Sequence, residues 1–338
     1  MKRTRFALLA LLTGLPAAMF AARGADAQEA PAAPATRSLS LATLAPAGST
    51  WHRVLDAWNR ELRRRTNKAL QLRIFAGGVQ GDEAEVIRKI RSGRLDGAAV
   101  TAVGLSQIHR PAIVFQMPGM FPSYAALDRA RGATQSDINA AFTTAGFAFM
   151  GWADVGMSRL FSRVPVATPA DMRNTHPYVW RDDLSTPAVF QEANVTPTQL
   201  QIPEVLTALQ TNRVDAFFTS PVAAISLQWA QRVTHMTDYN ANVVVGATVF
   251  GNAAINSLPA DQQAILRETA TQFHQLLIAN LRRDETAAIR SMNTRGITSV
   301  TVTDRGAWSS LFDRARARLV GRIADAAFIN RVRAAGGN

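Results

Sequence analysis

Two 13-residue segments of this chain resemble each other, and this repeat constrains the fold more than any other feature. Residues 204–216 read Glu-Val-Leu-Thr-Ala-Leu-Gln-Thr-Asn-Arg-Val-Asp-Ala, and residues 85–97, which lie 119 positions earlier, read Glu-Val-Ile-Arg-Lys-Ile-Arg-Ser-Gly-Arg-Leu-Asp-Gly. Each copy is typical of a helix that begins with an acidic residue, where the helix dipole favours negative charge. Each helix is expected to end at Gly93 or Asn212, because these residue types accept the left-handed conformation.

Apolar segments flank both predicted helices. We expect strands over residues 70–75 and 195–202 before the helices, and over residues 95–103 and 214–219 after them. A strand, a helix and a second strand joined by short connections form a parallel crossover unit. Two such units predict two similar α/β lobes, with a ligand site between them at the carboxyl ends of the strands. The alternative is a chance likeness between two unrelated crossover units.

The first 27 residues have the pattern of a secretory signal peptide. Three basic residues precede an uncharged run over residues 6–22, and residues 25–27, Ala-Asp-Ala, form a small-x-small cleavage site. The run is short and interrupted for a membrane span, although an uncleaved anchor is the alternative. Residues 28–37 are rich in Ala and Pro, which predicts a flexible lead-in. We therefore expect an exported protein.

Composition and missing motifs exclude several classes of function. The chain has no cysteine, so it has no disulfide, thiolate nucleophile or cysteine metal site. Its net charge of +12 comes from scattered arginines rather than from a basic patch on a nucleic-acid-binding module. The motifs GxSxG, HExxH, GxGxxG and the phosphate-binding loop are absent, and the five histidines stand alone. The carboxylate pair Asp182-Asp183 is expected to be solvated. We predict no enzyme activity, cofactor, metal or nucleic-acid partner.

One long helix is expected near the carboxyl terminus. Residues 261–294 contain neither Gly nor Pro, and a helix of this kind reaches about 45 Å, which is longer than one small lobe. It is therefore expected to span both lobes. We assign residues 38–154 and 250–300 to lobe I, residues 155–249 to lobe II, and residues 301–338 to a C-terminal helical segment.

Several segments in a fixed order resemble the solute-binding receptors of tripartite ATP-independent periplasmic (TRAP) transporters, the DctP family. The segments that carry the resemblance are residues 74–83 (Ile-Phe-Ala-Gly-Gly-Val-Gln-Gly-Asp-Glu), 117–121 (Met-Pro-Gly-Met-Phe), 165–172 (Pro-Val-Ala-Thr-Pro-Ala-Asp-Met) and 204–215. The resemblance runs from about residue 38 to residue 332. It implies a two-lobed α/β periplasmic solute-binding fold with a long helix spanning both lobes, hinge closure on a ligand, and delivery to the subunits of a membrane permease.

The chain departs from this family at the residues that grip the ligand. Members often clamp a carboxylate with two arginines, because the guanidinium fork matches it bidentately. One of these arginines usually ends a Gly-x-Arg motif. Residues 156–158 of this chain (Gly-Met-Ser) match that motif with Ser158 at the arginine position, and Arg159 follows one residue later. The other arginine usually lies in a Lys-[Ile/Leu]-Arg-Val motif. In the corresponding residues 176–181 of this chain, Tyr178 or Val179 takes the arginine position, and Arg181 follows. We expect Arg181 to supply the positive charge, with Arg159 as the nearest candidate in the other lobe.

A rival hypothesis needs no ion pair. Tyr178 and Trp180 alternate along a strand and so share one face, and aromatic rings with a few polar groups are typical of small-molecule clefts. The rival ligand is uncharged or rich in aromatic rings, with Arg181 in solvent; alternatively the two rings are ordinary core residues. Residues 215–219 also lack the glutamate with which some relatives bind a metal.

The sequence therefore predicts a monomeric receptor for a small organic solute, which the resemblance indicates is an organic acid. An exported binding protein with a sensor or chaperone role and a periplasmic enzyme are the alternatives. The candidate binding residues are Trp51, Thr101, Trp152, Ser158, Arg159, Tyr178, Trp180, Arg181, Thr219 and Ser220.

Overall fold

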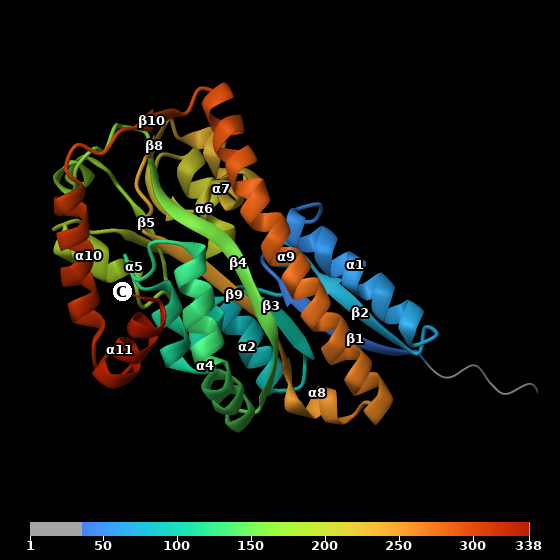
Figure 1. Cartoon of the computed structure of the whole chain (residues 1–338). Coiled ribbons are helices and arrows are strands. Elements are labelled where there is room, and N and C mark those ends of the chain that lie inside the picture. The colour runs from blue at the N-terminus through green and yellow to red at the C-terminus, as the bar shows by residue number, and fades with distance from the viewer. Residues whose placement is uncertain (1–35, 338) are drawn as a thin grey trace, which may run out of the picture. The chain divides into compact units, whose positions relative to one another are not determined.

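The computed structural model describes residues 36–337 (Figure 1). The predicted signal peptide, and the predicted lead-in up to residue 35, lie outside the described residues. Every element below belongs to one compact unit, which begins at Thr36.

The first predicted crossover unit is confirmed. Strand β1 pairs in parallel with both β2 and β3, which gives the strand order β2-β1-β3. The strand predicted over residues 70–75 is β2, and α2 is followed by Gly93 with a φ of +71°, as its position after the helix predicts. The elements are β1 (Arg37–Thr43), α1 (Thr50–Arg65), β2 (Leu70–Phe75), α2 (Glu83–Arg91), β3 (Gly97–Thr101) and α3 (Ala102–Ser106).

The second crossover unit has the same layout. Strand β5 pairs in parallel with β6, and a parallel bridge joins Pro177 to Ala216 at the start of β7, so the order β6-β5-β7 repeats β2-β1-β3. Asn212 follows α6 with a φ of +60°. Strand β6 is shorter than predicted, and it begins after Pro197, which has no N–H to donate. The elements are β5 (Tyr178–Trp180), α5 (Thr186–Glu192), β6 (Thr198–Leu200), α6 (Ile202–Gln210), β7 (Ala216–Thr219) and α7 (Pro221–Ser226).

Two long antiparallel strands join the repeats. Strand β9 (Asn242–Gly251) pairs with β3 of the first repeat, and β4 (Phe147–Ser162) pairs with β9 and with β7 of the second. Figure 1 shows β4 running through the middle of the sheet. The register of β4 shifts between Asp154 and Gly156, which is a bulge of the kind that bends a strand. The sheet continues through β8 (His235–Thr237) and β10 (Thr298–Val300).

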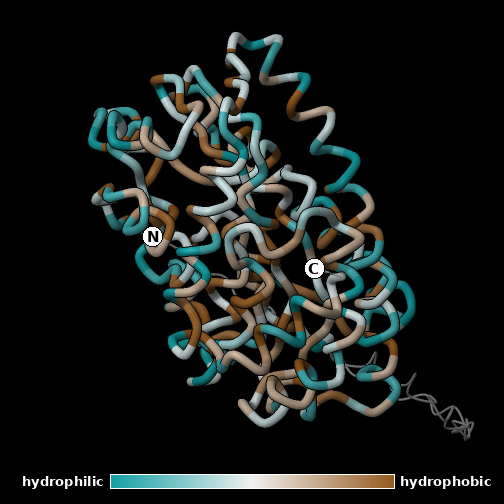
Figure 2. Tube along the Cα trace, turned by 60° about the vertical axis from the view of Figure 1, so that its left-hand side comes forward, coloured by the Kyte–Doolittle hydropathy of each residue, from teal (hydrophilic) through white to brown (hydrophobic). Residues whose placement is uncertain are grey.

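The long helix α9 (Ala260–Thr294) is continuous over 35 residues, about 52 Å, and begins one residue before the prediction. It packs against α1, β4 and α7. Leu277 and Leu281 of this helix share one apolar cluster with Val54 of α1 and Val222 of α7. The helix therefore contacts both repeats. In Figure 2 hydrophobic and hydrophilic residues alternate along the helices, as expected where one face packs on the protein.

The remaining helices complete the fold. The predicted C-terminal helical segment, residues 301–338, contains two helices, and the chain turns between them at Gly321, which has a φ of +75°. No helix among residues 36–337 is long and apolar enough to cross a membrane. The remaining elements are η1 (Arg110–Gln116), α4 (Tyr124–Thr144), η2 (Pro169–Asn174), η3 (Trp229–Arg232), α8 (Asn252–Asn256), α10 (Arg305–Leu319) and α11 (Ala326–Ala335).

Candidate functional site

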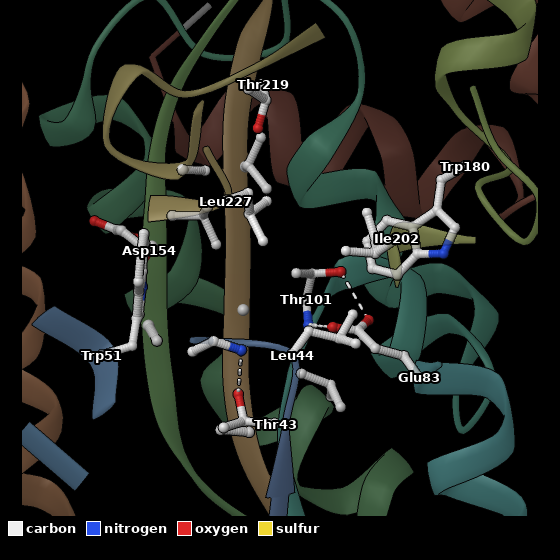
Figure 3. A pocket seen from close by; sticks show the side chains of 18 of the residues that line it. Thr43, Leu44, Trp51, Glu83, Thr101, Asp154, Trp180, Ile202, Thr219 and Leu227 are labelled. Carbon is white, nitrogen blue, oxygen red and sulfur yellow. Dashed lines mark hydrogen bonds between the residues drawn. The ribbon is translucent and has the colours of Figure 1, made fainter. Parts of the chain in front are cut away.

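A cavity of about 170 Å³ lies where the two repeats face each other (Figure 3). Four of its lining residues stand at the carboxyl ends of parallel strands: Thr43 on β1, Thr101 on β3, Trp180 on β5 and Thr219 on β7. The sequence predicted a site at these strand ends, and the cavity lies there. Figure 3 shows Trp180 and Ile202 on one side of the cavity and Trp51 on the other.

Six of the ten candidate residues line this cavity. The indole Nε1 of Trp51 donates to the backbone oxygen of Asp154 at 3.0 Å, which fixes the ring on that wall. The hydroxyl of Thr101 accepts from the backbone N–H of Val103 and so caps α3. The six residues are Trp51, Thr101, Ser158, Tyr178, Trp180 and Thr219.

Two other candidates have structural contacts instead. Trp152 packs between Phe115 and Phe149, and its Nε1 donates to Gln135 at 2.8 Å. Ser220 caps α7 and donates to the backbone oxygen of Val155 at 2.6 Å. In the two repeats Ser220 and Thr101 hold the same place, because each is the N-cap of the short helix after the last parallel strand.

The two arginines expected to clamp a carboxylate lie outside the cavity lining. Arg159 pairs with Asp238 at 2.8 Å. Arg181 pairs with Glu204 at 3.4 Å, and both side chains are about half exposed, at 48% and 49%. Arg181 follows the last residue of β5, where the side chain of Trp180 lines the cavity. The placement of Arg181 therefore matches the rival hypothesis, in which it faces solvent.

The lining residues include no arginine or lysine in the described part of the chain, but they include three carboxyl groups. Asp154 is compensated by Arg131 at 2.7 Å and Arg282 at 2.8 Å, which approach from outside the cavity. Glu83 and Asp183 have no such partner in the hydrogen bonds and ion pairs of residues 36–337. The cavity wall therefore offers no positive charge to a ligand.

Glu83 is held by uncharged donors only. Its carboxyl accepts from the backbone N–H of Thr101 at 2.8 Å, from the Thr101 hydroxyl at 2.8 Å and from the N–H of Gly104 at 2.7 Å. Burial raises the pKa of Glu83 to about 8, because the charged form loses its hydration. Glu83 thus fixes the turn from β3 to α3 and forms part of the cavity wall beside Trp180.

Asp183 corrects one sequence-based expectation. It was expected to be solvated with Asp182, but it is buried, with 7% of its surface exposed. Its carboxyl accepts from the backbone N–H groups of Ser185 at 2.7 Å and Thr186 at 3.2 Å, and burial raises its pKa. The signal that could have found it is the Asp-x-Ser spacing, which is typical of a side chain that bonds the backbone two residues on.

The aromatic wall is formed by Tyr178 and Trp180 of β5. Tyr178 is buried and packs edge-on against Trp229 at 5.7 Å between ring centroids. Burial raises the pKa of its hydroxyl, which has no hydrogen-bond partner within residues 36–337. The indole Nε1 of Trp180 donates to Oδ2 of Asp82 at 3.0 Å. An aromatic face with one free hydroxyl suits a flat or partly apolar solute.

A single carboxylate ties the two repeats together beside the cavity. Asp82 caps α2 by accepting from the N–H of Glu83 at 2.7 Å, and its other oxygen accepts from the N–H of Ile202 at 3.1 Å, at the start of α6. The equivalent helices of the two repeats therefore begin at the same side chain.

No group of three or more His, Asp or Glu side chains within residues 36–337 could hold a metal ion.

Two similar α/β repeats, joined by crossing strands and facing each other across a solute-sized cavity, define a solute-binding protein. The sequence model of bacterial extracellular solute-binding proteins, family 7 (DctP), matches residues 41–319, and the chain belongs to this family. The family and the fold are those of solute-binding proteins rather than enzymes.

Among curated proteins, the C4-dicarboxylate-binding periplasmic protein DctP of Shewanella loihica is 24% identical over 203 residues, which cover 58% of this chain and 59% of that protein. The chain spans about three fifths of the length of the curated relatives it matches.

Two solved structures share the fold. A TRAP periplasmic solute-binding protein of Shewanella oneidensis with bound succinate has a TM-score of 0.83 at 17% identity, over 89% of this chain and all of that one. A Bordetella pertussis extracytoplasmic solute receptor, DctP7, binding pyroglutamic acid, has a TM-score of 0.83 at 17% identity, over 90% of this chain and all of that one. The predicted two-lobed α/β fold is therefore confirmed.

Proposed function

We propose that this protein is the extracytoplasmic receptor of a TRAP-type secondary transporter. It binds one small organic solute in the cavity between the repeats and delivers it to the membrane permease. The observation that carries the proposal is the cavity itself, which is lined from the strand ends of both repeats within a solute-binding family. The family is extracytoplasmic, which supports a periplasmic location and cleavage of the leader before Gln28.

The relatives supply the first solutes to test. Their names and bound ligands include a C4-dicarboxylate, succinate and pyroglutamic acid. Small organic acids are therefore the first candidates for this chain, and we propose one of them as the transported solute. The lining residues within 36–337 include no arginine or lysine, so a dianion is a poorer fit than a solute with at most one negative charge.

Binding works by closure of two lobes about β4 in this proposal. Lobe I comprises residues 38–154 and 250–300, and lobe II residues 155–249. The register shift of β4 at Asp154 and Gly156 supports a boundary there. The contacts of Asp82 with Trp180 and Ile202 join the two lobes in the closed form.

A thermal-shift screen of small organic acids and their uncharged analogues on the mature protein tests the function. A true ligand at 100-fold over its Kd stabilises the folded state by about 2.7 kcal/mol. Small-angle scattering of the free and the saturated protein then measures closure. A chain that no member of the library stabilises would contradict the receptor function, and a hit with unchanged scattering would contradict closure.

A further inference from the structure

Four uncharged polar residues with unused hydrogen-bonding atoms line the cavity. Ser158 on β4 stands opposite Asn242 in the β4–β9 pair, and the next residue of β4 stands opposite Thr219 in the β4–β7 pair. Nδ2 of Asn242 donates to the backbone oxygen of Gln116 at 2.7 Å. The side chains of Ser158 and Asn242 therefore share one face of the sheet, and all four residues, Gln116, Ser158, Thr219 and Asn242, are among those that line the cavity.

These side chains are buried but keep unused hydrogen-bonding atoms. Their exposed fractions are 1% for Ser158, 5% for Gln116, 8% for Thr219 and 9% for Asn242. Oε1 of Gln116 accepts from the N–H of Val245 at 3.3 Å, which leaves its Nε2 group directed elsewhere. Within residues 36–337 no protein group bonds that Nε2, the hydroxyls of Ser158 and Thr219, or Oδ1 of Asn242. None of the four is among the fully buried side-chain atoms of residues 36–337 that lack a partner, so each is open to the cavity, where a bound molecule can pair with it.

The chemistry of the four groups defines what they can bind. The Nε2 group of Gln116 only donates, the hydroxyls of Ser158 and Thr219 donate or accept, and Oδ1 of Asn242 only accepts. Their complement is an oxygen-bearing group with an adjacent hydroxyl or N–H. Arg159 and Arg181 lie outside the lining, so no ion pair is required.

We propose that Gln116, Ser158, Thr219 and Asn242 form an uncharged hydrogen-bonding subsite that holds the polar end of the solute in place of an arginine clamp. The proposal rests on the receptor function above and deepens it. The solute has an end group of one class, a carboxylate or carboxamide with a neighbouring hydroxyl or N–H, and its remainder lies against Trp180 and Tyr178.

Calorimetry with pairs of acids and amides tests the subsite. The probes are pyroglutamate, lactate and glycerate, each with its carboxamide, on the mature protein. Gln116→Glu is nearly isosteric and keeps an oxygen for the N–H of Val245, but it replaces the donor with a negative charge. Ser158→Ala removes one hydroxyl. Arg159→Ala and Arg181→Ala are the matched controls, and the melting temperature of each unliganded variant reports its folding.

For the probe that binds the wild type most tightly, Ser158→Ala is expected to weaken binding about tenfold. Gln116→Glu is expected to weaken the binding of a carboxylate by more than the binding of its carboxamide. This difference distinguishes the two possible end groups of the solute. The controls stay within about twofold, and about 500 mM salt changes the affinity little.

Folded Ser158→Ala and Gln116→Glu proteins that bind like the wild type would overturn the subsite and leave the receptor function standing. A tenfold loss in either arginine variant would overturn it in favour of a clamp. A wild-type chain that binds neither these probes nor any library compound would overturn the receptor function, and the subsite with it.

Discussion

The indole Nε1 of Trp180 donates to Oδ2 of Asp82 over 3.0 Å, so the aromatic wall of the second repeat is bonded to the first helix turn of the other. The same oxygen accepts from the N–H of Ile202. One carboxylate oxygen therefore carries two contacts between the repeats, while the other oxygen caps its own helix.

Replacing Asp82 with Asn should open the cavity. The amide nitrogen cannot accept from both Trp180 and Ile202, so the closed form loses about 1–2 kcal/mol relative to the open form. Ligand affinity should fall about tenfold, and the free protein should show a larger radius of gyration by scattering. Trp180→Phe removes only the indole donor and gives a smaller loss. Unchanged affinity and scattering in Asp82→Asn would refute the link.

Glu83 should make stability depend on pH. Burial raises its pKa from 4.5 to about 8, so between these values the folded state holds a proton that the unfolded chain has lost. The free energy of unfolding therefore falls as the pH rises through this window, on the order of 5 kcal/mol in all. Glu83→Gln loses acceptors, so its free energy of unfolding, measured with urea, is lower than that of the wild type at low pH. This free energy does not fall as the pH rises, because the variant has no carboxyl group at position 83 to titrate. Glu85→Gln, on the exposed side of the same helix, is the control. Parallel pH profiles for wild type and Glu83→Gln would contradict the prediction.

Removing the Asp154 carboxylate should destabilise the fold strongly. Asp154 is fully buried and pairs with Arg131, which is itself 4% exposed. Asp154→Ala leaves the Arg131 charge without its closest partner, which costs about 3–5 kcal/mol by urea unfolding. The matched control is Arg181→Ala, which breaks the half-exposed pair with Glu204 and costs about 0–1 kcal/mol. Equal losses in the two variants would count against the assignment.

Gly156 at the bulge of β4 should not tolerate a side chain. Its φ is +125°, and a Cβ there would lie 2.8 Å from Cβ of Ser220. Gly156→Ala is expected to cost about 1–3 kcal/mol and to lower ligand affinity, because the bulge lies at the lobe boundary proposed above. Gly132→Ala has open space within α4 and should stabilise the protein by about 0.5–1 kcal/mol. An Ala at position 156 that leaves the melting temperature unchanged would disprove this reading of the bulge.

Local signals predicted most of the fold. Gly93 and Asn212 end their helices because their residue types accept a positive φ, and the uninterrupted sequence of α9 predicted its length to within one residue. The parallel strand ends placed Thr101 and Trp180 at the cavity for the same reason, since position in a crossover unit is a local property.

The rest of the candidate site depends on contacts between segments that lie far apart in the sequence, so it could not be predicted from local signals. Gln116 and Asn242 are brought together by the packing of η1 against β9 and by a hydrogen bond over 126 positions of sequence. Glu83 and Asp183 were not recognised, because their burial depends on neighbours from other segments. The direction of Arg181 could not be read from strand alternation, since the strand ends at Trp180.

Helix α9 has a mechanical consequence. Leu277 and Leu281 share an apolar cluster with Val54 and Val222, so one continuous helix packs against both repeats. Pulling the repeats apart must either bend this helix or expose the cluster to water, and both raise the energy. In the closure proposed above, the helix would therefore store elastic energy as the cavity opens and release it as the cavity closes on a solute.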